Sequence, residues 1–228
     1  MELLSYNADA KTVKGFEEGW VTFIMYLAPS TVSVPFGGHD TCPWKSPGCS
    51  KACLFTAGRG RMKNVMMGRT NKTLRYFNDR AGFLEQLQKD IDSAVRLAEK
   101  MGKRPCFRLN GTSDLNWSKI IHQNPSLQFY DYTASVDRVL ENDIPNYHLT
   151  FSRKETTPDS DVIKILNAGK NVSVVFSQPG VKSWMGYQVV DGDKNDLRFL
   201  DPKGVIVGLK AKGDGKKDET GFVVHAKV

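Results

Sequence analysis

Three of the four cysteines of this chain stand close together in the segment HDTCPWKSPGCSKACLFTAGRGR, at Cys42, Cys49 and Cys53. Thiolates gathered in one short segment are typical ligands of zinc ions and of iron-sulfur clusters. The Cys-x6-Cys-x3-Cys spacing differs from the paired Cys-x2-Cys pattern of structural zinc sites. Prolines and glycines in the segment predict a loop, residues 36–61, that wraps around a group larger than one ion. An iron-sulfur cluster fits this description.

A fourth ligand is the next question, because three thiolates leave one iron of a four-iron cluster open. Cys106 is expected about four residues before the end of a strand. At about 3.3 Å per residue, its sulfur would lie about 13 Å too deep in the sheet to reach a cluster bound at the edge where the strands end. We therefore expect a small buried residue at Cys106, and its role as a ligand stays open. His39 would complete a cluster or a tetrahedral zinc site, and the alternative is an ordinary loop histidine.

The chain is expected to be a soluble protein that folds as one domain over residues 1–228. Hydrophobic residues make up 40% of it, and no apolar run approaches the about 20 residues that span a bilayer. No membrane partner is therefore expected. The first residues lack the basic start and apolar core of a signal peptide. We expect the protein in a reducing cytoplasm, where disulfides are rare.

Strand-like and helical patterns alternate along the chain. Residues 20–27 predict a buried strand before the cysteine loop, and Phe77–Met101 has apolar residues at helical spacing. Further strands are expected at 105–109, 127–132, 147–152 and 172–176, with helices at 117–122, 136–141 and 161–168. This alternation predicts an α/β fold with parallel strands, here a partial (β/α) barrel of about five or six units. Residues 186–228 are expected to add a C-terminal extension with a final strand and a closing hairpin.

Polar residues follow the predicted strands, at the edge where barrels place their active sites. In the strand at 105–109, alternation places Cys106 and Arg108 on one face and Phe107 and Leu109 on the other. The loop that follows would present backbone amides to a carboxylate or phosphate of a cofactor. The alternative is a turn whose Ser or Asp caps the next helix. The candidate cofactor-binding residues are Asn110, Gly111, Thr112, Ser113 and Asp114.

The formal net charge of +7 favours polyanionic partners such as nucleic acid. Four basic residues are expected to form an anion-binding rim beside the metal: Arg59, Arg61, Lys63 and Arg69. The alternative is an ordinary solvated surface. The basic residues concentrate in two segments, with Arg59, Arg61, Lys63, Arg69, Lys72 and Arg75 in the first and Lys203, Lys210, Lys212, Lys216 and Lys217 in the second.

Three blocks in order, CPWKSPGCSKACLFTAGRG, RLNGTSDLNW and DLRFLDPKGVIVGLKAKG, resemble a family of tailed-bacteriophage proteins called gene product eighty-eight. That family is similar to a reduced radical S-adenosylmethionine (SAM) fold, in which a three-cysteine loop after the first barrel strand holds a four-iron four-sulfur cluster. The resemblance implies such a cluster on Cys42, Cys49 and Cys53, with SAM as a ligand of the open iron. It also implies a phage protein in the cytoplasm of the infected host cell. The cysteine spacing differs from the Cys-x3-Cys-x2-Cys of radical SAM enzymes.

We expect an iron-sulfur protein with a radical-SAM-like partial barrel, whose cluster is held by the three-cysteine loop. Two alternatives stay open. One is a catalytically active radical SAM enzyme that modifies nucleic acid, and the other is a zinc-stabilised module that binds nucleic acid. The sequence contains no G-x-x-x-x-G-K-[ST] loop, G-x-S-x-G elbow or H-E-x-x-H helix, so nucleotide-triphosphatase and hydrolase functions have no motif to support them.

Overall fold

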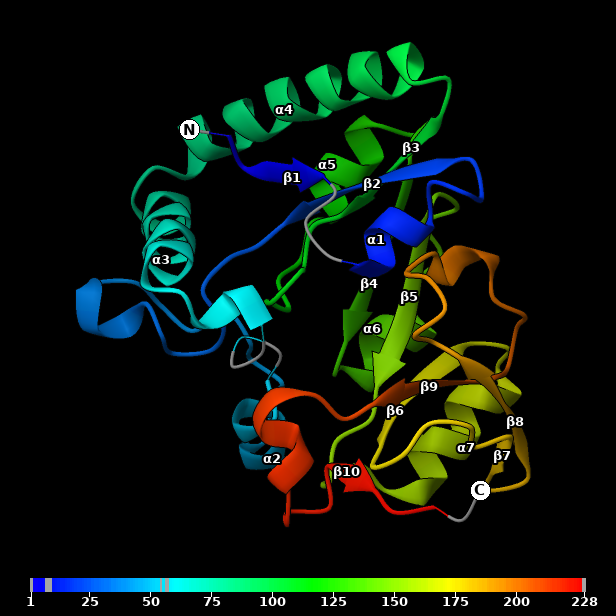
Figure 1. Ribbon diagram of the computed structural model, residues 1–228. Helices are drawn as coiled ribbons and strands as arrows, with labels where there is room; N and C mark the ends of the chain where they lie inside the picture. Colours follow the sequence, from blue (N-terminus) through cyan, green and yellow to red (C-terminus); the bar gives the residue numbers. More distant parts are fainter. Residues whose placement is uncertain (1, 7–9, 54, 56–57, 227–228) are drawn as a thin grey trace.

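Strands from the whole chain form one mixed sheet in the computed structural model, which describes residues 2–6, 10–53, 55 and 58–226 (Figure 1). The ten-stranded sheet has the order β1-β2-β3-β4-β5-β6-β9-β8-β7, with β10 beside β6. Strands β2 to β6, β9 and β8 pair in parallel, whereas β1 and β7 are antiparallel. The sheet is open. The strands are β1 (Leu4–Tyr6), β2 (Trp20–Met25), β3 (Arg104–Arg108), β4 (Gln128–Thr133), β5 (Tyr147–Ser152), β6 (Asn171–Phe176), β7 (Ser183–Trp184), β8 (Tyr187–Asp191), β9 (Ile206–Lys210) and β10 (Val223–Val224).

Helices connect the parallel strands and bury their apolar sides against the sheet. The longest, α4, begins where Asp79 accepts the N–H of Gly82 at 3.0 Å, and it buries Phe83, Leu87 and Ile91 at helical spacing. The α-helices are α1 (Ala10–Lys14), α2 (Pro47–Lys51), α3 (Lys63–Asn78), α4 (Arg80–Lys100), α5 (Ser118–Gln123), α6 (Val136–Leu140) and α7 (Asp159–Asn167). Short 3-10 helices are η1 (Val34–Phe36), η3 (Gly58–Arg61), η4 (Arg198–Leu200) and η5 (Gly213–Lys217). None of these described helices is both long and apolar enough to cross a bilayer.

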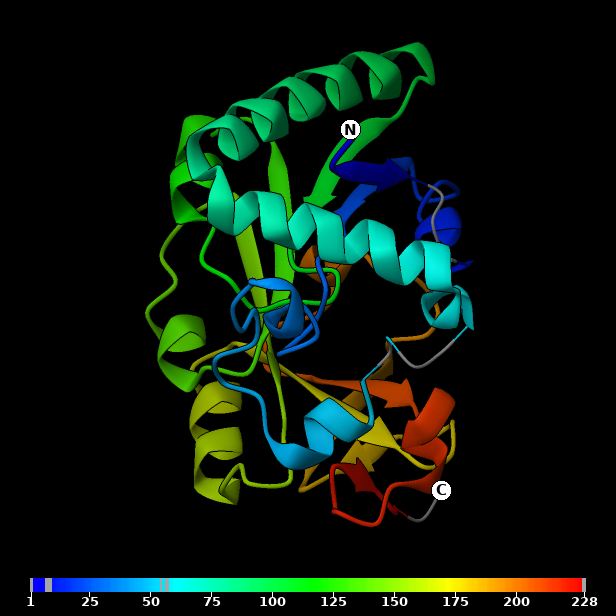
Figure 2. The same cartoon turned by 90° about the vertical axis from the view of Figure 1, so that its left-hand side faces the viewer.

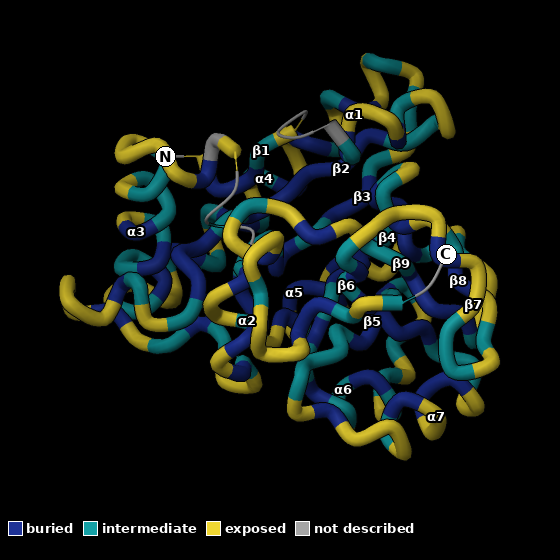
Figure 3. The backbone as a smooth tube through the Cα atoms, turned by 60° about the horizontal axis from the view of Figure 1, so that its bottom comes forward, coloured by how far each residue is buried: buried dark blue, intermediate teal, exposed yellow. Residues whose placement is uncertain are grey.

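The two faces of the sheet carry different side chains. Phe107 and Phe129 belong to the large apolar core that the helices cover, and in Figure 3 the strands run through this buried interior. Cys106 packs on the other side with Tyr130, confirming the alternation predicted for β3. There the carboxylate of Asp196 binds Arg108 Nη1 and accepts the Tyr130 hydroxyl, both at 2.9 Å. Polar groups on this face are therefore joined in a buried network.

An ionic contact connects segments next to β2 and β8, two strands near opposite edges of the open sheet. Lys11 of α1, which precedes β2, lies 2.8 Å from the carboxylate of Asp193, and its ammonium donates to the carbonyl of Gly192 at 3.0 Å. Asp193 follows β8 and also pairs with Lys212 at 2.8 Å. The segment before β2 is therefore joined to the segment after β8.

The sequence predicted most parallel strands within a few residues. The helix expected over Phe77–Met101 is confirmed as α4, Arg80–Lys100, although residues 77 and 78 belong to α3, which was not predicted. The closing hairpin expected at the end of the chain is wrong. The hairpin is β7–β8, and β9 inserts between β6 and β8. Residues 227–228 of the expected extension lie outside the described part.

Candidate metal centre

The cysteine loop leaves the carboxyl end of β2 and is tied back to the sheet by the buried Thr41. The Thr41 hydroxyl donates to the carbonyl of Ala28 at 2.7 Å, and the Thr41 carbonyl accepts the N–H of Asp114 at 2.8 Å. Figure 2 shows the loop between α3 and the C-terminal segment. Because Ala28 follows β2 and Asp114 follows β3, Cys42 is held at the edge where parallel strands end. Residues 54, 56 and 57 of the loop lie outside the described residues.

Cys42 is oriented by hydrogen bonds on both its backbone and its sulfur. Its N–H donates to Asp40 Oδ1 at 2.8 Å, and Asp40 pairs with Lys45. Its Sγ accepts the N–H of Ser30 at 3.3 Å and lies 3.8 Å from the Thr112 carbonyl oxygen. Burial raises the pKa of Cys42 to about 11. A metal would therefore displace a proton from this thiol at neutral pH.

Cys49 stands on α2, whose first turn is fixed by a carboxylate from a distant part of the chain. Ser46 caps the helix by accepting the N–H of Cys49 at 3.1 Å. The Glu155 carboxylate, from the segment between β5 and α7, accepts the Ser46 hydroxyl at 2.6 Å and the Gly48 N–H at 2.7 Å. A Cβ at Gly48 would come within 2.6 Å of this carboxylate, so a larger residue there would displace the Glu155 side chain.

The three thiols form one electrostatically coupled group. The pKa of Cys49 is raised to about 12, first by burial and then by the charges of Cys53 and Cys42. Burial also raises the pKa of Cys53. Among the described residues, no group of three or more His, Cys, Asp or Glu side chains is placed to hold a metal ion. Backbone N–H groups oppose the rise in pKa: the Ser30 N–H, 3.3 Å from the Cys42 sulfur, lowers the pKa of Cys42, and the backbone at Ser46 and Phe55 lowers the pKa of Cys49 and Cys53.

Arg69 of α3 brings a positive charge to this group. Its charge lowers the pKa of Cys53. The guanidinium carbon lies 4.6 Å from the ring centre of Tyr26 and 5.6 Å from that of Phe55, within the range of cation–π contacts. Burial lowers the pKa of Arg69, and the charge of Cys53 opposes this change. Arg69 was expected in an anion-binding rim, and in the structure its charge acts on the Cys53 thiol.

Other members of the basic segment are engaged within the protein. Arg61 pairs with Asp214 of η5 at 2.5 Å. Lys72 and Arg75 donate to backbone carbonyl oxygens at 2.9 and 3.2 Å. The side chain of Arg59 lies outside the described residues. Nucleic-acid binding by this rim stays a prediction.

Asn110, the first of the candidate cofactor-binding residues, organises the loop after β3. It is buried, and its side-chain oxygen accepts from the Ser113 hydroxyl, the Leu115 N–H and the Trp117 indole N–H at 2.9–3.1 Å. Its own N–H donates to the buried Asp131 at 2.7 Å. The polar groups of Asn110 and Ser113 are therefore used to close the loop.

The other three residues of this loop support the cysteine loop and its neighbours. The Gly111 N–H donates to the carbonyl of Met25 at 3.0 Å, and a side chain at Gly111 would meet that oxygen at 2.8 Å. The Thr112 carbonyl contacts Cys42, as described above. Asp114 pairs with Arg138 at 2.5 Å. The alternative role of Ser113 or Asp114 as a helix cap is wrong, because α5 begins only at Ser118. Cofactor binding by residues 110–114 stays a prediction.

Neither candidate for a fourth ligand is among the groups that shift the pKa values of the three thiols. Cys106 is fully buried in β3, where its sulfur is 3.3 Å from the Thr22 hydroxyl and burial raises its pKa to about 12. The groups that shift its pKa are Thr22 and Asp196, and none is another cysteine. This confirms the expected buried position of Cys106. The ring of His39 packs against Phe77 of α3, with ring centres 4.8 Å apart.

Glu155 was not identified from the sequence, because a lone glutamate after a strand carries no pattern. Arg69 was named, but its effect on Cys53 depends on α3, a helix that the sequence pattern did not predict. A protein-family model described as Gene product 88 matches residues 1–226 of the chain. No curated protein and no solved structure matches it.

Proposed function

We propose that this chain, which belongs to the Gene product 88 family, is an iron-sulfur protein in which Cys42, Cys49 and Cys53 hold one four-iron four-sulfur cluster. The observation that carries the proposal is that the three thiols of this loop interact electrostatically, since Cys53 raises the pKa of both Cys42 and Cys49, while the Cys42 sulfur accepts the Ser30 N–H at 3.3 Å. Backbone amides directed at sulfur stabilise thiolates, and such hydrogen bonds tune the potential of a cluster. The family match confirms the predicted resemblance to this phage family. The argument for a cluster depends on the arrangement of the three thiols.

The chain contributes ligands and electrostatics to such a site. The three thiolates would bind three irons and leave the fourth for another ligand, and the group would supply one-electron transfer. Arg69 offsets the negative charge of Cys53, and its own position is fixed between the rings of Tyr26 and Phe55. Glu155 holds the helix that carries Cys49.

We extend the proposal to the fold, as a partial (β/α) barrel of the radical SAM type. Three features support it. The parallel strands are adjacent in the order β2-β3-β4-β5-β6, the cysteine loop follows β2 directly, and Lys11 and Asp193 connect opposite sides of the open sheet. Such a cluster requires a reducing compartment, so we place the protein in the cytoplasm of the infected host cell.

A zinc-stabilised module is the competing function, because the same thiolates are zinc ligands. Metal analysis after anaerobic purification separates the two, since a cluster contains iron and sulfide and a zinc site contains neither. Cys42→Ala, Cys49→Ala and Cys53→Ala should each remove the iron. Cys106→Ala is the matched control, because it removes a thiol that lies elsewhere in the sheet.

Radical SAM chemistry is tested by paramagnetic resonance of the reduced cluster with and without SAM. A signal that shifts when SAM is added would show an open iron that SAM can reach. An unchanged signal would favour a non-catalytic iron-sulfur protein.

A further inference from the structure

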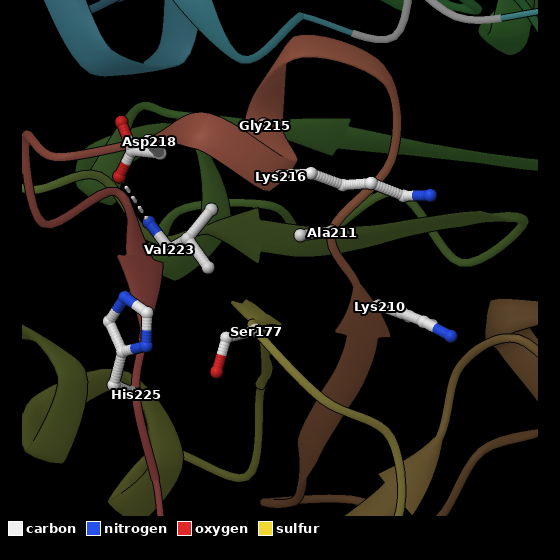
Figure 4. Close-up of a pocket in the computed structure, with 8 residues that line it drawn as sticks. All are labelled: Ser177, Lys210, Ala211, Gly215, Lys216, Asp218, Val223 and His225. Carbon is white, nitrogen blue, oxygen red and sulfur yellow. Dashed lines mark hydrogen bonds between the residues drawn. The ribbon is translucent and has the colours of Figure 1, made fainter.

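A pocket of about 270 Å³ opens where strands β6 and β9 end (Figure 4). Ser177 directly follows β6, and Lys210 is the last residue of β9, the parallel neighbour of β6. Lys216 of η5 and His225, next to β10, also line the pocket. The Ser177 N–H donates to the carbonyl of Val224 at 3.0 Å. Because His225 follows Val224, this hydrogen bond keeps His225 close to Ser177. The pocket thus lies at the carboxyl edge of the sheet, where α/β proteins bind ligands.

The residues that line the pocket carry more positive than negative charge. Within the described part of the chain, neither Lys210 nor Lys216 forms an ion pair, and both side chains are exposed. The carboxylate among the lining residues belongs to Asp218, and it accepts the Thr220 hydroxyl at 2.7 Å and the Val223 N–H at 2.9 Å. These hydrogen bonds help to lower the pKa of Asp218.

Two aspartates near the pocket are also engaged. Asp214, next to the lining residue Gly215, pairs with Arg61, and Asp193, which accepts the Lys210 N–H at 2.8 Å, pairs with Lys11 and Lys212. The lining residues therefore include two lysines, one serine and one histidine, while the Asp218 carboxylate is engaged with other partners. A ligand that satisfies this set must be anionic and must accept several hydrogen bonds.

We propose that this pocket binds a phosphate group. Phosphate accepts hydrogen bonds on several oxygens and is bound by lysine as a point charge. Loops after late strands of a barrel are common phosphate sites, which agrees with the position after β6 and β9. The groups named for phosphate are side chains of β9 and η5 and of residues beside β6 and β10, so the proposal does not depend on a metal.

The pocket and the cysteine loop share an apolar wall. Ala211 and Val223 line the pocket and belong to a small buried cluster with Ala52, against which Cys49 packs. A side chain at Gly215 would lie 3.5 Å from Ala52. A phosphate bound in the pocket would therefore lie across this wall from the loop that carries the thiols.

Titration calorimetry of the full chain with inorganic phosphate, adenosine monophosphate and a single-stranded oligothymidylate tests the proposal. The double variant Lys210→Gln/Lys216→Gln should bind phosphate at least about tenfold more weakly, which equals about 1.4 kcal/mol. The matched control Lys119→Gln/Lys203→Gln removes the same charge from exposed positions outside the pocket and should bind as the wild type does. Circular dichroism checks that each variant is folded.

The ligands distinguish two sources of phosphate. If a free nucleotide is the source, adenosine monophosphate binds at least as tightly as the oligonucleotide. If the source is a nucleic-acid backbone, the oligonucleotide binds more tightly, and loss of both lysines reduces its log-log salt slope by about 1.4. Absence of binding to all three ligands overturns the proposal. Equal weakening in both double variants, or equally tight binding of acetate, also overturns it.

Discussion

Replacing Glu155 by glutamine should loosen the cysteine loop and speed the loss of its metal. The carboxylate accepts two short hydrogen bonds, from the Ser46 hydroxyl at 2.6 Å and the Gly48 N–H at 2.7 Å. Hydrogen bonds to a charged acceptor contribute about 1.5–3 kcal/mol each. The glutamine side chain keeps one acceptor oxygen and turns its NH2 group toward the other donor. One of the two hydrogen bonds is therefore lost.

The lower value, about 1.5 kcal/mol, applies because the Glu155 side chain is partly exposed. A free-energy difference of this size corresponds to a change of about tenfold in an equilibrium constant. The assay is the rate of iron release to a chelator under anaerobic conditions, for wild type and Glu155→Gln. Glu99→Gln, which changes an exposed carboxylate of α4, is the control. Release should be about tenfold faster in Glu155→Gln alone. Equal rates in all three proteins would refute the role given to Glu155.

Three further predictions concern residues around the site. Cys106→Ala should keep its iron and sulfide, because Cys106 contacts Thr22 and not the other thiols; loss of iron from a folded variant would contradict this. Gly111→Ala should lower the free energy of unfolding by about 1–3 kcal/mol, since the added carbon meets the Met25 carbonyl at 2.8 Å; urea unfolding measures it, and an unchanged value would contradict the close approach. Burial raises the pKa of Asp131 to about 7, so the unfolded chain loses this proton first and stability falls as pH rises from about 4 to about 7. Asp131→Asn should remove that contribution, at most about 4 kcal/mol, and make stability rise more steeply with pH over this range; urea unfolding at several pH values that gives the same slope for both proteins would contradict it.

The parallel strands could be predicted because their apolar residues and the helices between them follow simple periodicities. The strand at β3 is an example, since Phe107 and Cys106 lie on opposite faces as expected. α3 could not be predicted in this way. The residues that it buries are Thr70, Thr73 and Tyr76, which give little apolar contrast. Without α3, the effect of the Arg69 charge on Cys53 could not be predicted either.

The candidate site was predicted only in part, for a different reason. The thiols are recognisable because they stand together in one segment. Their supports come from distant segments, as Glu155 and the loop at 110–114 show. Local patterns do not reveal which carbonyl or carboxylate reaches the loop across the fold. The position of β9 between β6 and β8 likewise depends on pairing between distant strands.

The iron and acid-labile sulfide content of anaerobically purified protein tests the proposed cluster most directly. About four irons and four sulfides per chain are expected in the wild type. Each of Cys42→Ala, Cys49→Ala and Cys53→Ala should lose them, because the three thiols form one coupled group. One zinc ion per chain without sulfide, or wild-type iron content in any of these three variants, would contradict the proposed cluster.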